Sequence, residues 1–498
     1  METRHYLLPS VEALESAEGL RLERVIQHSG DAVLYDTFDG KLWDAGALLM
    51  HALGELRVVG SELRAPFSQA PDAISAADLP SGPLKARLEP LLGVRSALAQ
   101  VRISGNAANY KLLDELDKTI ARVEVQDAAV GSADLGVRAH VWPLRGYEEE
   151  TDALFAGRFQ ACSEGIYAEA MAAVGRDPHG IRSKVRVGLS GHEWADGGVA
   201  RVLRALWDVI DANREGTLED TDIEFLHDYR VCVRKSRAVL KELRGVFTPA
   251  ARAHWRAEFR WLQQVTGATR DLDVYLEDFD ELAGLVPAQD RAALEPLRTV
   301  LANRRVAARE AMVTELRSRR AVALGHEWPL YLARLTEEPV AERPDASAKI
   351  DTVAFTRIRK LYSKMVKMGQ AIMEGEPHTP AEDYHELRKQ GKELRYLVEL
   401  FGEPLGDAEI VKPMVRTLKG LQDVLGRHQD REVQGAFVRE LVDDVAAVEG
   451  SAPALLAMGS LIGALERDEV AARAEFGAAF TRFSSEEQRT LVKEAFGK

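Results

Sequence analysis

Cysteine is almost absent from this 498-residue chain, which contains only Cys162 and Cys232. Two cysteines in so long a chain exclude a disulfide framework and fit a reducing cytoplasm. Cys232 falls on the apolar side of a predicted helix, so we expect it to be a small core residue.

Long apolar runs are absent as well. No segment reaches the roughly 18 apolar residues that a membrane-spanning helix needs. The first residues, Met-Glu-Thr-Arg-His, are not followed by the apolar core of a signal peptide. We therefore expect a cytoplasmic protein that makes no membrane contact.

Positive charge is in the minority, with 65 Lys and Arg residues against 79 Asp and Glu residues. The formal net charge of −14 excludes the broad basic surface of a general DNA-coating protein. Tyr229 and Tyr396 lie near basic residues, but aromatic residues do not alternate with cations as base stacking requires. Nucleic acid is therefore not an expected partner.

Cations are nevertheless concentrated in one stretch, residues 227–244, which the absence of Gly and Pro predicts to be helical. At about 100° per residue, its basic residues fall on a single stripe: His227, Arg230, Arg234, Arg237, Lys241 and Arg244. Like charges at this spacing repel one another, so the stripe favours a bound polyanion. The alternative is a solvated face with a capping histidine.

The same pattern occurs again between residues 385 and 401. His385, Arg388, Lys392 and Arg395 repeat the phase of the first stripe at an offset of 385 − 227 = 158 residues. Downstream, residues 262–274 match residues 421–433 at an offset of 421 − 262 = 159. Two motif pairs at nearly one offset indicate an internal duplication. We expect the two stripes to face one another and to form one basic cavity.

These motifs resemble a known family. The segments beginning His227-Asp-Tyr-Arg, Leu262-Gln-Gln-Val, His385-Glu-Leu-Arg-Lys and Leu421-Gln-Asp-Val are similar to the four marker blocks of the CHAD domain, the conserved histidine α-helical domain. The resemblance covers about residues 190–498. It implies two similar four-helix bundles around a basic channel that binds inorganic polyphosphate. It also implies a location at polyphosphate granules, with granule proteins as partners.

Further cations are candidate polyphosphate ligands. They lie beside the two stripes or on other helices with related spacing: Lys235, Arg270, Arg304, Arg305, Arg357, Lys360, Lys364, Lys389 and His428. For Arg304 and Arg305 the alternative is pairing with Glu310 or Glu315, and for the lysines near residue 360 it is a solvated face. We expect the acids of the Arg270–Asp273 and Gln429–Asp430 blocks to orient Arg or His side chains.

The N-terminal part has a different pattern. Short strands are predicted at 32–37, 58–59, 101–103, 120–125 and 137–141, a loop at 66–83, and helices at 84–98 and 147–175. The stretch from Tyr35 to Gly46, with Pro143-Leu-Arg-Gly-Tyr147, resembles the CYTH, or triphosphate tunnel, family, whose fold is an antiparallel barrel. A plain hairpin is the alternative for the first stretch.

The CYTH resemblance is degenerate. The family begins Glu-x-Glu-x-Lys, but here the start is Glu2-Thr-Arg4-His-Tyr6, and Leu48-Leu-Met-His51 stands in place of Leu-Arg-x-Arg. Because the metal-binding acids and phosphate-binding cations are both lost, we expect no triphosphate hydrolysis. No nucleophile–base pair, Gly-rich phosphate loop or metal cluster is present in the sequence, so we expect no cofactor and no enzyme.

We therefore expect an α+β protein with a tunnel domain over residues 1–187 and helical bundles over 188–335 and 349–498. Helices are predicted at 200–213, 250–265, 272–285, 289–324, 350–373, 381–401, 408–425, 431–448 and 454–476. His227 and His385 have no second His or Cys at a metal spacing, which leaves anion binding, catalysis as a base or capping. Alternative functions are an active tunnel enzyme that uses the bundles for substrate docking, and a nucleic-acid or protein scaffold.

Overall fold

The computed structural model describes residues 4–162 and 166–497. Glu2 and Thr3 of the CYTH-like start lie outside the described residues. The chain divides into two compact units, Met1–Arg182 and Ser183–Lys498. The first is built on an antiparallel sheet and the second is all-helical, so the chain as a whole is α+β.

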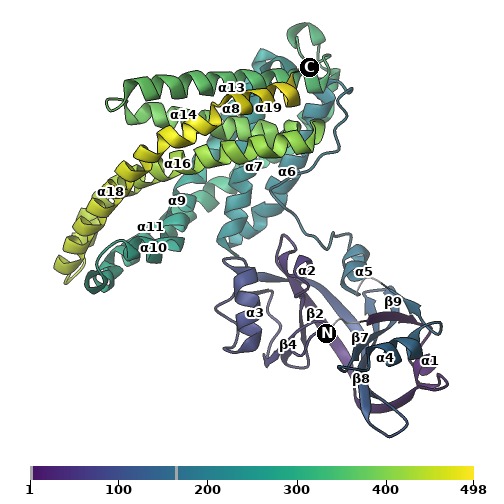
Figure 1. Ribbon diagram of the computed structural model, residues 1–498. Coiled ribbons are helices and arrows are strands. Elements are labelled where there is room, and N and C mark those ends of the chain that lie inside the picture. The colour runs from purple at the N-terminus through teal and green to yellow at the C-terminus, as the bar shows by residue number, and fades with distance from the viewer. Residues whose placement is uncertain (1–3, 163–165, 498) are drawn as a thin grey trace. The chain divides into compact units, whose positions relative to one another are not determined.

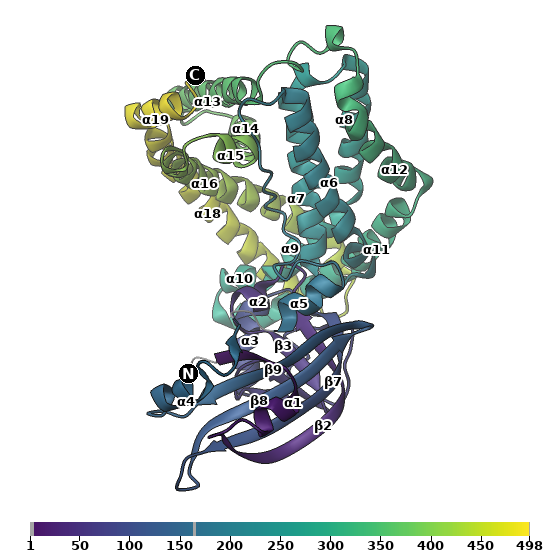
Figure 2. The same ribbon diagram turned by 90° about the vertical axis from the view of Figure 1, so that its right-hand side faces the viewer.

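Ten strands form the sheet of the first unit in the order β10-β1-β9-β8-β7-β2-β3-β4-β5, and β6 pairs with β7 (Figure 2). Their bounds are β1 Arg4–Leu8, β2 Arg21–Asp36, β3 Leu49–Ala52, β4 Glu55–Val58, β5 Arg64–Pro66, β6 Ala73–Ile74, β7 Ala97–Leu113, β8 Thr119–Val130, β9 Ala133–Pro143 and β10 Gln160–Ala161. The expected antiparallel barrel is not closed. Among the described residues the two edge strands of the sheet, β10 and β5, do not pair with each other.

Five helices complete the unit: α1 Val11–Glu15, α2 Lys41–Asp44, α3 Pro83–Leu92, α4 Glu148–Phe155 and α5 Ile166–Ala173. Leu84 and Leu88 of α3 and Tyr167 of α5 pack in separate apolar clusters against the sheet. The predicted helix at 84–98 is correct up to Leu92 and wrong beyond it, because the chain turns at Gly93 and continues as β7. The predicted loop at 66–83 contains β6, and the predicted helix at 147–175 is divided by β10.

The second unit contains long helices joined by short turns (Figure 1). Its α-helices are α6 Ala195–Glu219, α7 Ile223–Glu242, α8 Pro249–Val265, α9 Gly267–Glu277, α10 Phe279–Gly284, α11 Glu295–Leu316, α12 Arg319–Arg334, α13 Ile350–Gly375, α14 Ala381–Leu397, α15 Glu403–Leu405, α16 Ala408–Glu440, α17 Val442–Ala446, α18 Ala452–Phe483 and α19 Glu486–Phe496.

Local sequence signals explain several helix ends. Asp222 is the N-cap of α7, where its side chain accepts a hydrogen bond from the backbone N–H of Glu224 at 3.0 Å. An acidic cap of this kind favours a helix N-terminus by satisfying a free N–H and by its negative charge. The predicted helix at 289–324 is interrupted, because Ser318 caps the start of α12.

Two predicted helices, 408–425 and 431–448, are in fact mainly one continuous helix, α16. The glycine at position 426 does not end it, because the apolar side chains of Leu421, Val424, Leu425 and Val438 stay buried on one face. Tertiary packing therefore outweighs the low helix propensity of glycine.

Two apolar cores connect the parts of the helical unit. The larger contains residues of α6, α7, α8, α12, α13, α14, α16, α18 and α19. The smaller joins α9, α10 and α11 to the ends of α16 and α18, and in it the Tyr275 ring stacks on that of Phe437 at a centroid distance of 4.7 Å. The helices that carry the cationic stripes, α7 and α14, are thus held by packing on their opposite faces.

Candidate polyanion-binding surface

The two cationic helices, α7 and α14, meet directly. Lys241 Nζ of α7 binds both carboxylate oxygens of Glu393 of α14, at 2.5 and 2.6 Å. Lys235 Nζ lies 3.1 Å from an oxygen of Glu399, in the π-helical turn that follows α14. These ion pairs fix how the two helices lie against each other.

Next to these ion pairs, further cations from both helices gather, and two of them are paired with acids: Arg388 with Asp430 at 2.7 Å and Arg270 with Glu277 at 3.8 Å. We define the α7–α14 surface by the side chains of His227, Arg230, Arg234, Arg270, Arg388 and Lys392. Arg270 belongs to α9, and the others lie on α7 or α14. The sequence predicted each of them as a ligand of a polyanion.

The pKa of Lys392 shows this clustering most directly. Burial, together with the positive charges of Arg388 and Arg234, lowers the pKa of its ammonium group to about 8. Arg234 lies on the other helix, so the two stripes share one electrostatic environment. An ammonium group held among guanidinium groups is stabilised when an anion binds nearby.

The α7 side of the surface has the same character. Burial lowers the pKa of the Arg230 guanidinium to about 10, and Arg234 and Arg270 contribute by charge repulsion. Its Nη1 donates to the carbonyl of Gln263 at 2.8 Å and to Thr266 Oγ1 at 2.7 Å. These neutral acceptors hold the side chain without cancelling its charge.

Three guanidinium nitrogens at this surface have no hydrogen-bond partner among the described residues. Arg230 Nε, Arg234 Nε and Arg270 Nη1 are all buried donors. Buried donors are normally satisfied, and leaving one unpaired costs about 1–3 kcal/mol. Oxyanions that reached these nitrogens would remove that cost.

Acidic side chains near the surface orient the cations. Asp430 accepts a hydrogen bond from Arg388 Nη2 at 2.7 Å, and Gln429 Oε1 lies within hydrogen-bond distance of His385 Nδ1. The pKa of the Asp271 carboxyl is raised, because the effect of burial is larger than the opposing effect of the Arg230 charge. The expectation that these blocks hold Arg and His side chains is confirmed for Gln429 and Asp430.

Several other predicted ligands lie in tight ion pairs instead. Lys235 is 4% exposed, and besides Glu399 its Nζ donates to the carbonyl of Ser183 at 3.1 Å. Arg357 of α13 binds Glu242. Arg395 Nε donates to Glu399 at 2.7 Å. Together with the Lys241–Glu393 pair, these contacts join α7, α13 and α14.

Arg304 and Arg305 of α11 are each bound by two acids. Arg304 contacts Glu440 and Asp444 at 2.9 and 2.6 Å. Arg305 contacts Asp220 at 2.6 Å and Asp273 at 2.5 Å, and the hydrogen bond that it donates to Asp220 raises its pKa. The partners are long-range acids and not Glu310 or Glu315, which lie on the same helix.

His428, Lys389, Lys360 and Lys364 lie apart from the α7–α14 surface. His428 is 3% exposed inside α16, where its ring contacts that of Tyr384 edge-on at 5.0 Å and its Nδ1 lies 3.5 Å from Glu469. The break that the two predicted helices 408–425 and 431–448 leave around it is wrong, because α16 is continuous there. Lys389 is exposed and pairs with Glu386 and Glu382.

Lys360 and Lys364 lie on the exposed face of α13. They line an open hollow together with Arg359 and Lys367 and the hydroxyl groups of Thr356 and Ser363. No interaction links this hollow to the α7–α14 surface among the described residues.

The sequence reading missed a row of arginines on α8. Arg252, Arg256 and Arg260 recur every four residues beside α7. The charges of Arg260 and Arg256 lower the pKa of Arg237, after the larger effect of burial. Their four-residue spacing was the available signal, but the histidine of this helix, His254, is not in phase with the arginines as His227 and His385 are with theirs.

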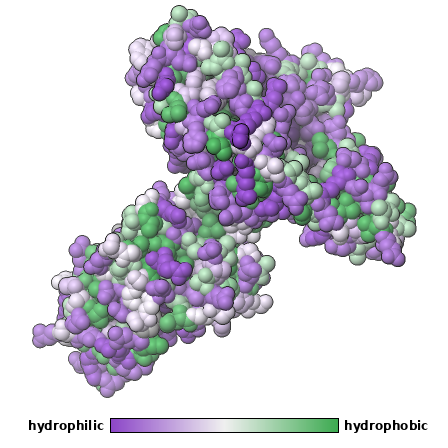
Figure 3. Space-filling model, turned by 180° about the vertical axis from the view of Figure 1, so that it is seen from behind, coloured by the Kyte–Doolittle hydropathy of each residue, from purple (hydrophilic) through white to green (hydrophobic). Residues whose placement is uncertain are grey.

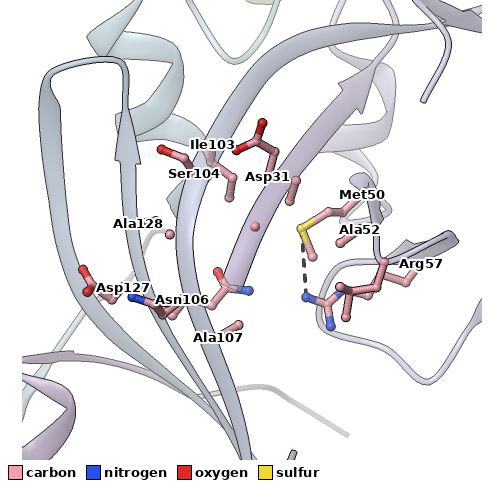
Figure 4. A pocket seen from close by; sticks show the side chains of 15 residues that line it. Asp31, Met50, Ala52, Arg57, Ile103, Ser104, Asn106, Ala107, Asp127 and Ala128 are labelled. Carbon is pink, nitrogen blue, oxygen red and sulfur yellow. Dashed lines mark hydrogen bonds between the residues drawn. The ribbon is translucent and has the colours of Figure 1, made fainter. Parts of the chain in front are cut away.

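The first unit has a pocket on its sheet, lined by residues of β2, β3, β4, β7 and β8 (Figure 4). Arg57 is the only Lys, Arg or His among the described residues that line it. Its guanidinium binds Glu124 at 2.6 and 3.1 Å. This pocket therefore lacks a group of free cations that could hold a triphosphate.

The described residues contain no group of three or more His, Cys, Asp or Glu side chains arranged to hold a metal ion. No helix in the described part of the chain is long and apolar enough to cross a membrane. On the face shown in Figure 3, hydrophilic residues predominate over the helical unit. That surface suits a charged ligand better than an apolar one.

The fold and the clustered cations define an all-α domain with a cationic surface. Residues 201–439 match the model of the CHAD domain family, so the helical unit contains a CHAD domain. The crystal structure of the CHAD domain from the plant Ricinus communis is similar over 60% of this chain and 95% of that one, with 24% identity and a TM-score of 0.49. PptA from Streptomyces chartreusis is similar over 58% and 100%, with 18% identity and a TM-score of 0.44. The comparison with curated proteins gave no match.

Proposed function

We propose that this protein binds inorganic polyphosphate at the α7–α14 surface and does not hydrolyse it. The CHAD family is associated with polyphosphate. The observation that carries the proposal is the proximity of Arg234 and Lys392, which come from two helices and repel each other in the free protein. A ligand with many negative charges relieves this repulsion, whereas a neutral ligand does not.

Polyphosphate fits this surface for chemical reasons. It is a flexible chain that carries about one charge per phosphate and has no bases to stack. Guanidinium groups can bind its oxygens through two parallel hydrogen bonds, and such charge-assisted bonds are about twice as strong as neutral ones. Because binding releases counterions, the affinity falls steeply as salt rises.

The same proposal covers the finer architecture. Residues 188–335 and 349–498 are then two related bundles that each contribute one cationic helix to a shared channel. The first unit, residues 1–187, is a CYTH-like domain that has lost its activity. The place of action is the cytoplasm, at polyphosphate granules.

The first unit supports the non-enzymatic part of the proposal. Tyr6 occupies the position of the lysine in the CYTH pattern, and it is 7% exposed and stacked on Phe155 at a centroid distance of 4.9 Å. A buried aromatic ring in an apolar cluster cannot replace a phosphate-binding ammonium group.

Two measurements on the full-length protein test this function. In the first, long-chain polyphosphate and RNA compete for the protein at fixed salt, and we expect polyphosphate to displace RNA. In the second, phosphate release from tripolyphosphate and polyphosphate is followed with Mg²⁺ or Mn²⁺, and we expect none. Metal-dependent release would favour the tunnel enzyme, and stronger binding of RNA would favour the nucleic-acid scaffold.

A further inference from the structure

A second row of cations runs along α8, next to the α7–α14 surface. We define the α8 row as Arg252, Arg256 and Arg260. At about 100° per residue, these side chains share one flank of the helix. The aromatic side chains of Trp255 and Phe259 are buried against Trp328 of α12, at centroid distances of 4.9 and 5.0 Å. This packing fixes which flank of α8 faces outward.

Charges on α8 are separated by sign. Glu258 lies on the opposite flank, where it binds Arg320 of α12 at 2.9 Å. The guanidinium of Arg320 also lies over the Trp261 ring, 4.5 Å from its centroid. The flank that carries the α8 row therefore has no acid of its own helix to neutralise it.

Contacts with α7 place the row beside the candidate site. Arg252 Nε donates to the carbonyl of Leu240 at 2.9 Å, near the end of α7. Gln263 connects the two helices further along, because its side chain accepts from Arg237 and its carbonyl from Arg230. Arg237 thus stands between Arg230 of the α7–α14 surface and the α8 row.

The α8 row remains available to a ligand. No carboxylate lies within ion-pair distance of Arg256, Arg260 or the neighbouring Arg244 in the described part of the chain. Arg260 and Arg244 are exposed, and Arg256 is half-buried. The nearest acid of α14 on this side, Glu393, is bound by Lys241.

We propose that the α8 row is a secondary binding surface that takes the part of a long polyphosphate chain extending beyond the α7–α14 surface. This inference rests on the proposed function. The path from Arg234 to the end of α7 at Glu242 spans eight helical residues, or about 12 Å, and the α8 row runs beside it. A short oligophosphate held at Arg234 and Lys392 does not reach the row, whereas a long chain contacts both.

Chain length therefore separates the two surfaces experimentally. The affinities of the full-length protein for tripolyphosphate and for long-chain polyphosphate are measured by calorimetry, with and without Arg256→Ala plus Arg260→Ala. We expect the variant to lose about tenfold in affinity for the long chain, through lost phosphate contacts, and less than about twofold for tripolyphosphate. The matched control is Arg204→Ala with Arg439→Ala, which removes two exposed arginines paired with Asp208 and Glu466.

Each outcome has a distinct meaning. Unchanged affinity for both ligands would overturn the α8 inference and leave the α7–α14 surface standing. Equal losses for both ligands would also overturn it, because Arg256 and Arg260 would then belong to the primary site. Absence of polyphosphate binding by the unsubstituted protein would instead overturn the proposed function.

Discussion

Arg234 on α7 lies close enough to Lys392 on α14 for its charge to lower the pKa of that lysine. The two residues are 392 − 234 = 158 positions apart in the chain. The relationship matters because it joins two cationic helices into one surface, which neither helix provides alone. It also gives that surface properties that can be measured.

Polyphosphate affinity should depend on pH near the pKa of Lys392. Burial and neighbouring cations lower this pKa to about 8 in the free protein, and a bound polyanion raises it again. Affinity should therefore be full below pH 8 and fall between pH 8 and 10, by up to about tenfold per pH unit at the steepest point. Calorimetry at pH 7, 8 and 9 measures this change.

Lys392→Arg is the matched variant, because arginine stays protonated over this range. Its affinity should vary less between pH 7 and 9 than that of the unsubstituted protein. An identical pH profile in both proteins would show that Lys392 does not titrate on binding.

The free protein should gain stability when the Lys392 charge is removed. A lysine whose pKa is lower folded than unfolded destabilises the fold while it is charged, below pH 8, and this effect disappears as pH rises toward the unfolded pKa near 10.4. We expect Lys392→Met to raise the free energy of unfolding by about 1–3 kcal/mol at pH 7. Urea unfolding at pH 7 and pH 10 measures it. A destabilised variant at pH 7 would contradict the pKa assignment.

Lys235 should contribute to stability and not to binding. It is buried, and its loss leaves the carbonyl of Ser183 and one side of Glu399 without a donor. Lys235→Ala should lower the free energy of unfolding by about 1–3 kcal/mol and change polyphosphate affinity by less than about twofold.

Lys389→Ala is the control, since that side chain is 48% exposed and its removal should change stability by less than about 0.5 kcal/mol. Weaker binding by Lys235→Ala with unchanged stability would assign Lys235 to the site.

Much of the helical unit is predictable from sequence because its signals are local. Asp222 caps α7 as expected from acids before a helix, and Cys232 is buried on its apolar face. Two predicted helix ends were wrong for different reasons. Long-range burial carries α16 through Gly426, whereas the start of α12 is set by a local side-chain cap at Ser318 that the periodicity did not reveal. The internal duplication stays a prediction.

The candidate site was predictable in part for a related reason. Helical phase identifies which cations share a face, and it brought His227, Arg230 and Arg234 together. Phase does not identify ion pairs between distant segments. Arg305 meets Asp220 and Asp273 only through the tertiary fold, and His428 is buried beside Tyr384 and Glu469, which are both distant from it in the chain. The α8 row was missed because its arginines become candidate ligands only through their position beside α7, which the sequence alone does not show.

The most direct test is the affinity for long-chain polyphosphate of Arg234→Ala with Lys392→Ala, measured by calorimetry as a function of salt. The matched control is Arg204→Ala with Lys412→Ala, which removes the same two charges from exposed ion pairs with Asp208 and Glu409. We predict that the first variant stays folded, loses at least about tenfold in affinity, and has a salt dependence shallower by about two released counterions, while the control binds as the unsubstituted protein does. Equal affinity and equal salt dependence in both variants would contradict the account.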